Sequence, residues 1–156
     1  MRRMAGWLVG LLIVAAVAGS AWVRLAPDDP ALWHVDPLSG ASTGRHNEAR
    51  ILPPGGAGEG IASPVFAITP EALMRRFDAA AMADARVTRL AGGPEALFAT
   101  YVQRSAVFGW PDYVSVRAVE AEGGAALAVW SRARYGYSDM GVNRARLERW
   151  LAATSG

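Results

Sequence analysis

The chain has 156 residues, enough for one ordinary domain rather than two. Hydrophobic residues make up 52% and charged residues only 19%, so we expect part of the chain to lie in lipid. All basic residues are arginines, and the absence of cysteine excludes a disulfide scaffold, a cysteine-ligated metal and a cysteine nucleophile. The formal charge is +2, and it becomes −1 once Arg2, Arg3 and Arg24 are set aside. Such a body has no basic surface for nucleic acid, which we exclude as a partner.

Residues 1–24 contain an apolar run. No charged residue occurs from Met4 to Val23, and a helix of that length spans roughly 30 Å, the thickness of the hydrocarbon core of a bilayer. Trp7 and Trp22 lie near its ends, where amphipathic rings favour the membrane interface. This segment predicts one amino-terminal transmembrane helix, through which the membrane is a partner.

The charges beside the run predict its orientation. Arg2 and Arg3 precede it and only Arg24 follows closely, so the amino terminus is expected in the cytoplasm. A cleaved signal peptide is the alternative, because Ala16-Val17-Ala18 fits a cleavage site. Both interpretations place the rest of the chain outside the cytoplasm. A lysine-free composition rich in alanine and arginine is typical of GC-rich bacteria, so we expect a single-pass inner-membrane protein with a periplasmic carboxy-terminal domain.

Residues 25–64 are rich in proline and glycine. Six of the nine prolines fall between Pro27 and Pro64, and four glycines cluster between positions 55 and 60. This composition predicts an extended linker without regular elements. The run Trp33-His34-Val35-Asp36-Pro37 is the exception, since a disordered tether rarely needs tryptophan, and we expect it to pack on the domain.

Two histidines occur in the chain, and each precedes a carboxylate by two residues. His34 is followed by Asp36, and His46 by Glu48. This spacing matches no metal-ligand signature. We therefore predict neither a metal site nor a cofactor.

Residues 65–156 read as an α+β domain. Thr69-Pro70-Glu71 is a typical helix start, and apolar spacing continues that helix to Ala83. Glycine and proline turns then separate short strands. The predicted fold is an antiparallel β-meander of about four to five strands packed with two helices, behind the amino-terminal transmembrane helix. The strands are expected at 65–68, 86–91, 96–107, 113–121 and 125–135.

A second helix is expected to begin at a Ser138-Asp139 cap. Met140, Asn143, Leu147, Trp150 and Leu151 would share one face of it, so the Asn143 amide needs buried partners. In the preceding strand, Trp130, Arg132 and Arg134 line the face opposite to Leu127 and Val129. We expect that arginine side to lie outside the deep core.

Several short motifs recur in an order that we can relate to a known family. They are Thr100-Tyr101, Arg104-Ser105, Gly109-Trp110-Pro111-Asp112, Ser131-Arg132, Gly136-Tyr137-Ser138-Asp139, and Gly141-Val142-Asn143 with Arg146. With these motifs, residues 30 to 153 resemble the bacterial family catalogued as domain of unknown function 1499. The resemblance implies a small domain behind an amino-terminal hydrophobic segment, and it implies no activity, cofactor or substrate.

Three functional hypotheses remain open. The first is a structural or interaction role in the bacterial envelope, with an envelope protein or a lipid as further partner. The second is a binding module, in which arginines and aromatic rings bind an anionic or lipid ligand. Its candidate ligand-binding residues are Arg104, Ser105, Trp110, Asp112, Arg132, Arg134, Tyr137, Ser138, Asp139, Asn143 and Arg144.

The third hypothesis is a hydrolase. Ser105, Ser131 or Ser138 could act as a nucleophile with His34, but no Gly-x-Ser-x-Gly motif surrounds any of them. Most serines next to an aspartate at a helix start are caps. We therefore assign no catalytic residue and lean against an enzyme.

Overall fold

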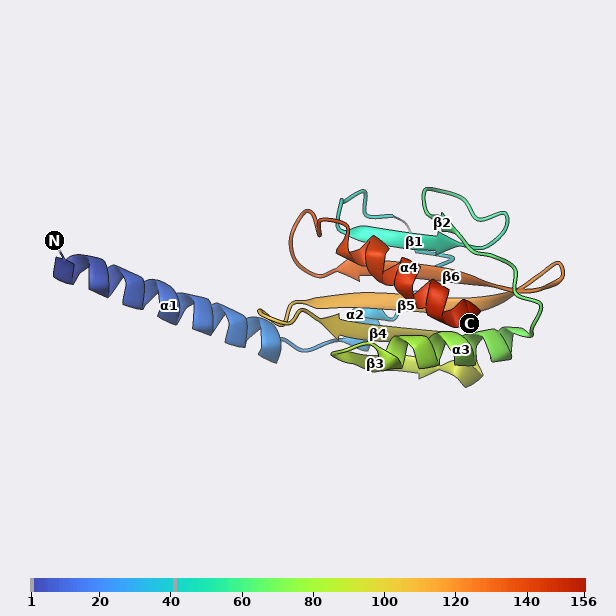
Figure 1. Cartoon of the computed structure of the whole chain (residues 1–156), viewed down its shortest axis with the longest axis horizontal. Coiled ribbons are helices and arrows are strands. Elements are labelled where there is room, and N and C mark those ends of the chain that lie inside the picture. The colour runs from blue at the N-terminus through green and yellow to red at the C-terminus, as the bar shows by residue number, and fades with distance from the viewer. Residues whose placement is uncertain (1, 41) are drawn as a thin grey trace.

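The computed structural model describes residues 2–40 and 42–156, and it has a mixed α+β architecture (Figure 1). One six-stranded sheet carries helices on one face and an irregular segment on the other. In chain order the elements are α1 (Arg2–Leu25), α2 (Pro30–Trp33), β1 (Glu48–Leu52), β2 (Ile61–Ala62), α3 (Pro70–Ala83), β3 (Val87–Gly93), the short 3-10 helix η1 (Pro94–Ala96), β4 (Phe98–Arg104), β5 (Pro111–Ala121), β6 (Gly124–Ala133) and α4 (Val142–Ser155).

The strand order in the sheet is β2-β1-β6-β5-β4-β3. Strands β3 to β6 form the predicted antiparallel meander. Strand β1 adds antiparallel to β6, and β2 pairs with β1 in parallel. The sheet therefore has six strands instead of the predicted four to five. The strand expected at 65–68 is reduced to one bridge, between Phe66 and Ala125.

The two additional strands come from residues 25–64, where no regular element was expected. That expectation is wrong for β1 and β2, and for the single turn of α2. In β1, Ile51 is buried in the core while Arg50 lies over the Trp130 ring on the other face. This alternation extends over only five residues beside Pro53-Pro54, so the surrounding composition hides it.

Helix α3 begins as predicted. The Thr69 hydroxyl accepts a hydrogen bond from the Ala72 amide at 3.3 Å, and Leu73, Phe77 and Ala81 are buried. Their spacing places them on one side of the helix, which packs against the sheet.

Helix α4 begins at Val142, two residues later than the Asp139 cap predicts. Gly141 precedes it with a φ of +82°, a conformation that favours glycine. The Asp139 carboxylate still accepts the amides of Gly141 and Asn143, at 3.0 and 2.7 Å. Met140 therefore lies outside the helix and is 97% exposed, so its predicted place on the inward face is wrong.

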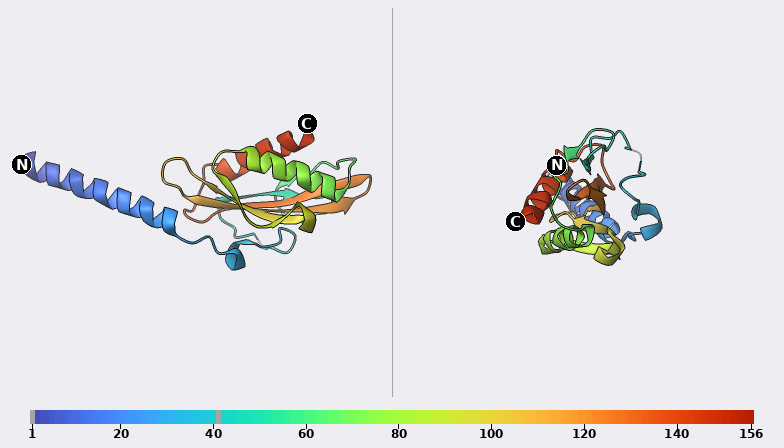
Figure 2. Two further views of the ribbon diagram at one scale, coloured as in Figure 1. Left: turned by 90° about the horizontal axis from the view of Figure 1, so that it is seen from below. Right: turned by 90° about the vertical axis from the view of Figure 1, so that its right-hand side faces the viewer.

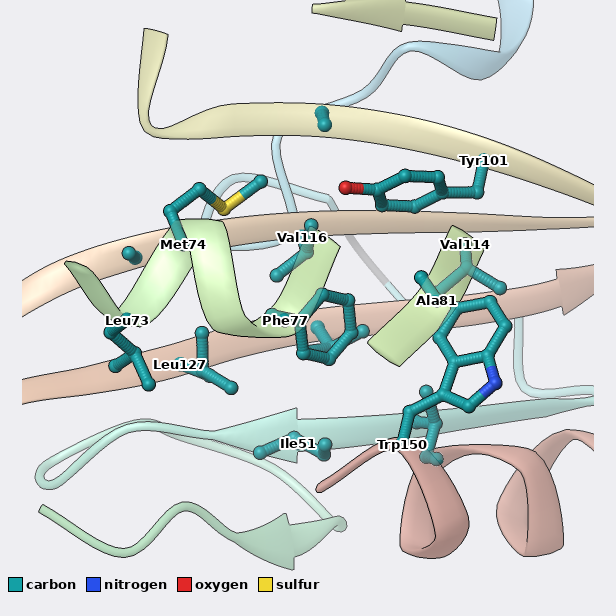
Figure 3. Packing of buried hydrophobic residues seen from close by; sticks show 14 of the residues in the cluster. Ile51, Leu73, Met74, Phe77, Ala81, Tyr101, Val114, Val116, Leu127 and Trp150 are labelled. Carbon is teal, nitrogen blue, oxygen red and sulfur yellow. The ribbon is translucent and has the colours of Figure 1, made fainter. Parts of the chain in front are cut away.

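Helices α3 and α4 cover one face of the sheet (Figure 2). Between them lies an apolar core in which Phe77 and Trp150 meet edge to face, with ring centroids 5.8 Å apart (Figure 3). Tyr101 meets the Trp150 ring at 6.1 Å from the sheet side. The opposite face is covered by residues 27–40, here called the strap, which include α2.

Helix α1 extends away from the sheet (Figure 1). Apolar side chains along it are exposed, among them Trp7, Leu12 and Trp22. Within residues 2–40 and 42–156, no helix combines the length and the apolar character that crossing a membrane requires. The transmembrane helix stays a prediction.

Candidate functional site

The strap is attached to the sheet by stacked rings. Trp33 stacks on Tyr113 with centroids 3.9 Å apart, and His34 stacks on Phe98 at the same distance. The His34 Nδ1 atom is 2.9 Å from the Thr100 hydroxyl. The expectation that the Trp33–Pro37 patch packs on the domain is thereby confirmed.

Arg132 is buried under the strap, with 7% of its surface exposed. Its guanidinium lies over the Trp130 ring at 4.0 Å and donates to the Trp33 carbonyl at 2.9 Å. Burial lowers the pKa of Arg132 to about 10, because the charged form loses water. Arg132 lies outside the apolar core between the sheet and the helices, as predicted, but the strap also excludes solvent from it.

Two further candidate arginines also hold the strap. Arg104 pairs with Asp28 at 2.7 Å, and Arg134 donates to the Pro27 carbonyl at 3.0 Å. The Tyr113 hydroxyl donates to Asp28 at 2.6 Å, which completes the attachment. Hydrogen bonding to the Asp28 carboxylate and burial raise the pKa of Tyr113 to about 12, burial being the larger cause.

Two other candidate ligand-binding residues, Arg144 and Tyr137, lie away from the strap. Arg144 lies on α4, where it pairs with Glu148 at 3.0 Å. Tyr137 is exposed and meets the His46 ring edge to face. The structure therefore does not bring Arg104, Arg132, Arg134 and Arg144 into one concave patch.

A pocket of about 450 Å³ lies at the end of the sheet where β4 turns into β5 and β6 leads into α4. Six of the predicted ligand-binding residues line it. They are Arg104, Ser105, Trp110, Asp112, Ser138 and Asp139. Loops far apart in sequence meet here because the β4–β5 turn and the β6–α4 connection leave the sheet at the same end.

Arg146 occupies the floor of this pocket and is 2% exposed. It donates to Asp112 at 2.6 Å and to Ser131 at 3.0 Å, and its Nε donates to the side-chain amide oxygen Oε1 of Gln103. A further bond of 2.6 Å joins it to Asn143. Charge-assisted bonds of this kind fix both partners, so the floor is rigid and polar.

Asn143 lies beneath the floor and is fully buried. Its Oδ1 accepts from Ser131 and Arg146, and its Nδ2 donates to the Asn47 carbonyl at 3.0 Å. The predicted need of this amide for buried partners is confirmed. Asn47 comes from the chain just before β1, so the network joins the edge of the sheet to α4.

Burial raises the pKa of Asp112 above its usual value, against the attraction of Arg146. The nearby charge of Asp139 acts in the same direction as burial. A carboxyl group with a raised pKa in a concave site is a feature of binding and catalytic centres. Asp112 is therefore the most distinctive titratable group of the pocket.

A second part of the lining, here called the wall, is apolar and aromatic. Trp110 comes from the β4–β5 turn, Tyr135 and Met140 from the β6–α4 connection, and Val142 from the first turn of α4. Arg86 and Arg149 lie among the polar lining residues. The pocket thus joins a charged floor to an apolar wall.

Sequence reasoning did not name Arg146 or Gln103 as candidate site residues. Arg146 follows Asn143 by three residues, which places both on one face of a helix and is the signal that could have found it. Gln103 gave no such signal, because its role depends on the pairing of β4 with β5 and on the approach of α4.

The serines considered as nucleophiles have structural partners. Ser105 Oγ accepts the Trp110 amide at 3.0 Å, and Ser138 Oγ accepts the Met140 amide at 3.3 Å. Ser131 belongs to the Arg146 network, and His34 lies on the strap face bonded to Thr100. In the described part of the chain, no group of three or more His, Asp or Glu side chains is placed to hold a metal ion.

A comparison with family models matches residues 53–153 to the family described as "Protein of unknown function (DUF1499)". The match covers more than half of the chain, so this protein belongs to that family. Comparisons with curated proteins and with solved structures found no match. All the pocket-lining residues lie inside the matched range, whereas the strap and β1 precede it.

Proposed function

We propose that this protein is a binding module that holds an amphiphilic molecule of the lipid class in the pocket at the end of the sheet. One observation carries the proposal: a pocket of about 450 Å³ combines a buried Asp112–Arg146 ion pair with a wall of aromatic and apolar side chains. Concave sites of this size, apolar with a few convergent polar groups, are the usual form of small-molecule binding sites.

The floor and the wall suggest different parts of the ligand. A polar head would form hydrogen bonds with Asp112 and Ser105, and the Arg86 guanidinium suits an acidic group on that head, whereas Arg149 is paired with Asp84 at 3.0 Å. An acyl or similar apolar group would lie against Trp110 and Met140. An amphiphile satisfies both halves of the pocket, whereas a purely ionic ligand would leave the wall in water.

We further propose that α1 anchors the module in a bacterial inner membrane, with the domain in the periplasm. A helix that is apolar on all sides is typical of a core or a bilayer, and exposed apolar residues occur around the whole circumference of α1. Arg2 and Arg3 before the apolar run favour a cytoplasmic amino end. A lipid-class ligand is consistent with such a position.

Binding can be tested with a soluble short-chain phospholipid, dihexanoyl phosphatidylglycerol, added to the full chain in detergent and followed by native mass spectrometry. Val142→Trp should fill the pocket and weaken binding at least tenfold. Met82→Trp is the matched control, since Met82 is exposed on α3 and does not line the pocket. Equal, saturable binding by both variants would place the phospholipid elsewhere and contradict the proposal.

A structural or interaction role in the envelope is the second candidate. The engagement of Arg104, Arg132 and Arg134 by the strap favours it, because these residues act as fold determinants. Under this alternative, Val142→Trp would leave the function of the protein in cells intact.

A further inference from the structure

Two loops at the pocket end expose apolar side chains next to each other. Val107, Phe108 and Trp110 belong to the β4–β5 turn, and Tyr137, Met140 and Val142 belong to the β6–α4 connection and the start of α4. We call these six residues the apolar rim. Trp110, Met140 and Val142 also line the pocket, so the rim lies beside the pocket mouth.

The rim is attached to the end of α1. The Arg24 guanidinium donates to the Val107 carbonyl at 2.8 Å, and the Ser20 hydroxyl donates to the Phe108 carbonyl at 3.3 Å. Gly109 has a φ of +73°, and a Cβ atom there would lie 2.7 Å from the Arg24 side chain. The turn and the helix end are therefore in close contact, and α1 leaves the domain at the rim (Figure 1).

We propose that the apolar rim rests on the interface of the lipid bilayer in which α1 is anchored. The inference rests on the proposed anchor and adds a second contact with the membrane. The exposed apolar surface of α1 continues onto Val107 and Phe108, so a bilayer that surrounds the helix reaches the turn. Aromatic rings such as Trp110 and Tyr137 favour the headgroup region, where an apolar body and a polar edge are both satisfied.

This contact places the pocket mouth at the membrane surface. Phe108 and Trp110 stack with centroids 5.1 Å apart, which gives the rim one flat aromatic side. Clustered exposed apolar side chains mark interaction surfaces, and here the bilayer is the occupant that the position of α1 supplies. An amphiphile could then pass from the bilayer into the pocket without crossing water.

The absence of cysteine allows a direct test on the full chain. Phe108→Cys and Met140→Cys would each carry a nitroxide label, in protein reconstituted into vesicles of phosphatidylethanolamine and phosphatidylglycerol. Glu122→Cys is the control, because Glu122 is exposed in the β5–β6 turn at the opposite end of the sheet. Collision of the label with oxygen, which enters lipid, is compared with collision with a water-soluble nickel chelate.

At positions 108 and 140 we expect the label to collide more often with oxygen than with the nickel chelate. At position 122 we expect the reverse. Nickel dominance at all three positions would overturn the rim contact while leaving the anchor and the pocket untouched. Low collision with both reagents at 108 and 140 would also overturn it, since a protein partner would then cover the rim. Release of the chain from washed vesicles would overturn the rim and the anchor together, whereas phospholipid binding in the pocket is measured separately in detergent.

Discussion

The two faces of the sheet are covered in different ways. The helix face is an apolar core of the usual kind, in which Phe77, Tyr101 and Trp150 meet at ring distances of 5.8 to 6.3 Å. The strap face buries arginine instead, and Arg132 lies against the Trp130 ring. The difference teaches that arginine on a strand does not identify a solvent-exposed face of the sheet, because stacked rings and backbone carbonyls can replace the water around the guanidinium.

The largest expected effect is on the helix face. Phe77→Ala should lower the free energy of unfolding by about 3–5 kcal/mol, because it leaves a cavity in a fully buried cluster. Chemical denaturation measures it, with exposed Met82→Ala as a control expected within about 0.5 kcal/mol of wild type. A loss below 1 kcal/mol for Phe77→Ala would mean that this face is not the main core.

The second largest loss of stability is expected in the polar network of Asn143, Ser131 and Arg146 at the end of the sheet. Asn143→Ala should cost about 1–3 kcal/mol, since the Ser131 hydroxyl and the Arg146 guanidinium each lose one buried acceptor. A melting curve checks this, and Asn143→Asp tests whether an acceptor alone restores part of the loss. Unchanged melting of Asn143→Ala would contradict a structural role for the amide.

Local periodicity was enough to predict the meander and α3. The Thr69 cap and the spacing of Leu73 and Phe77 predict α3 from residues that are close in sequence. The alternation along β5 predicts that strand in the same way. The burial of Arg132 could not be predicted in this way, because Trp33, which covers it, is 99 positions away in sequence. Strands β1 and β2 were missed for a similar reason, since long-range pairing determines them rather than their composition: β1 pairs with β6, and β2 pairs with β1.

The candidate site was predicted in part. Ser105, Trp110 and Asp139 were named from motifs, and the structure brings them to one pocket. Arg132 and Arg134 were grouped with them because strand alternation does not tell which face receives a cover. Gln103 was missed because its contact with Arg146 requires the position of α4.

Loosening the strap should have a smaller and local effect. Trp33→Ala removes the stack on Tyr113 and should cost about 1–1.5 kcal/mol. Hydrogen exchange should rise in residues 30–37 while the amides of β4 and β5 stay protected, and Leu32→Ala, which changes an exposed neighbour, is the control. A uniform rise across the sheet would mean that strap and core unfold as one unit.

The smallest expected effect depends on pH. Burial and the charge of Arg117 lower the pKa of His34 below its usual value of 6.5. The unfolded chain therefore takes up this proton at a higher pH than the folded chain, and the stability that neutral His34 contributes is lost as the pH falls below 6.5. Denaturation at pH 7.5 and pH 5.0 should give a smaller acid loss for His34→Phe than for wild type, and equal losses would contradict the assignment.

The central claim is that the pocket holds an amphiphile. It is tested most directly by mass spectrometry of the full-length protein extracted from the cells that produce it, under native and then denaturing conditions. We predict a reproducible additional mass in the range of a lipid, present in wild type, lost on denaturation and reduced in Val142→Trp. The bare polypeptide mass under native conditions, in wild type and variant alike, would contradict the account.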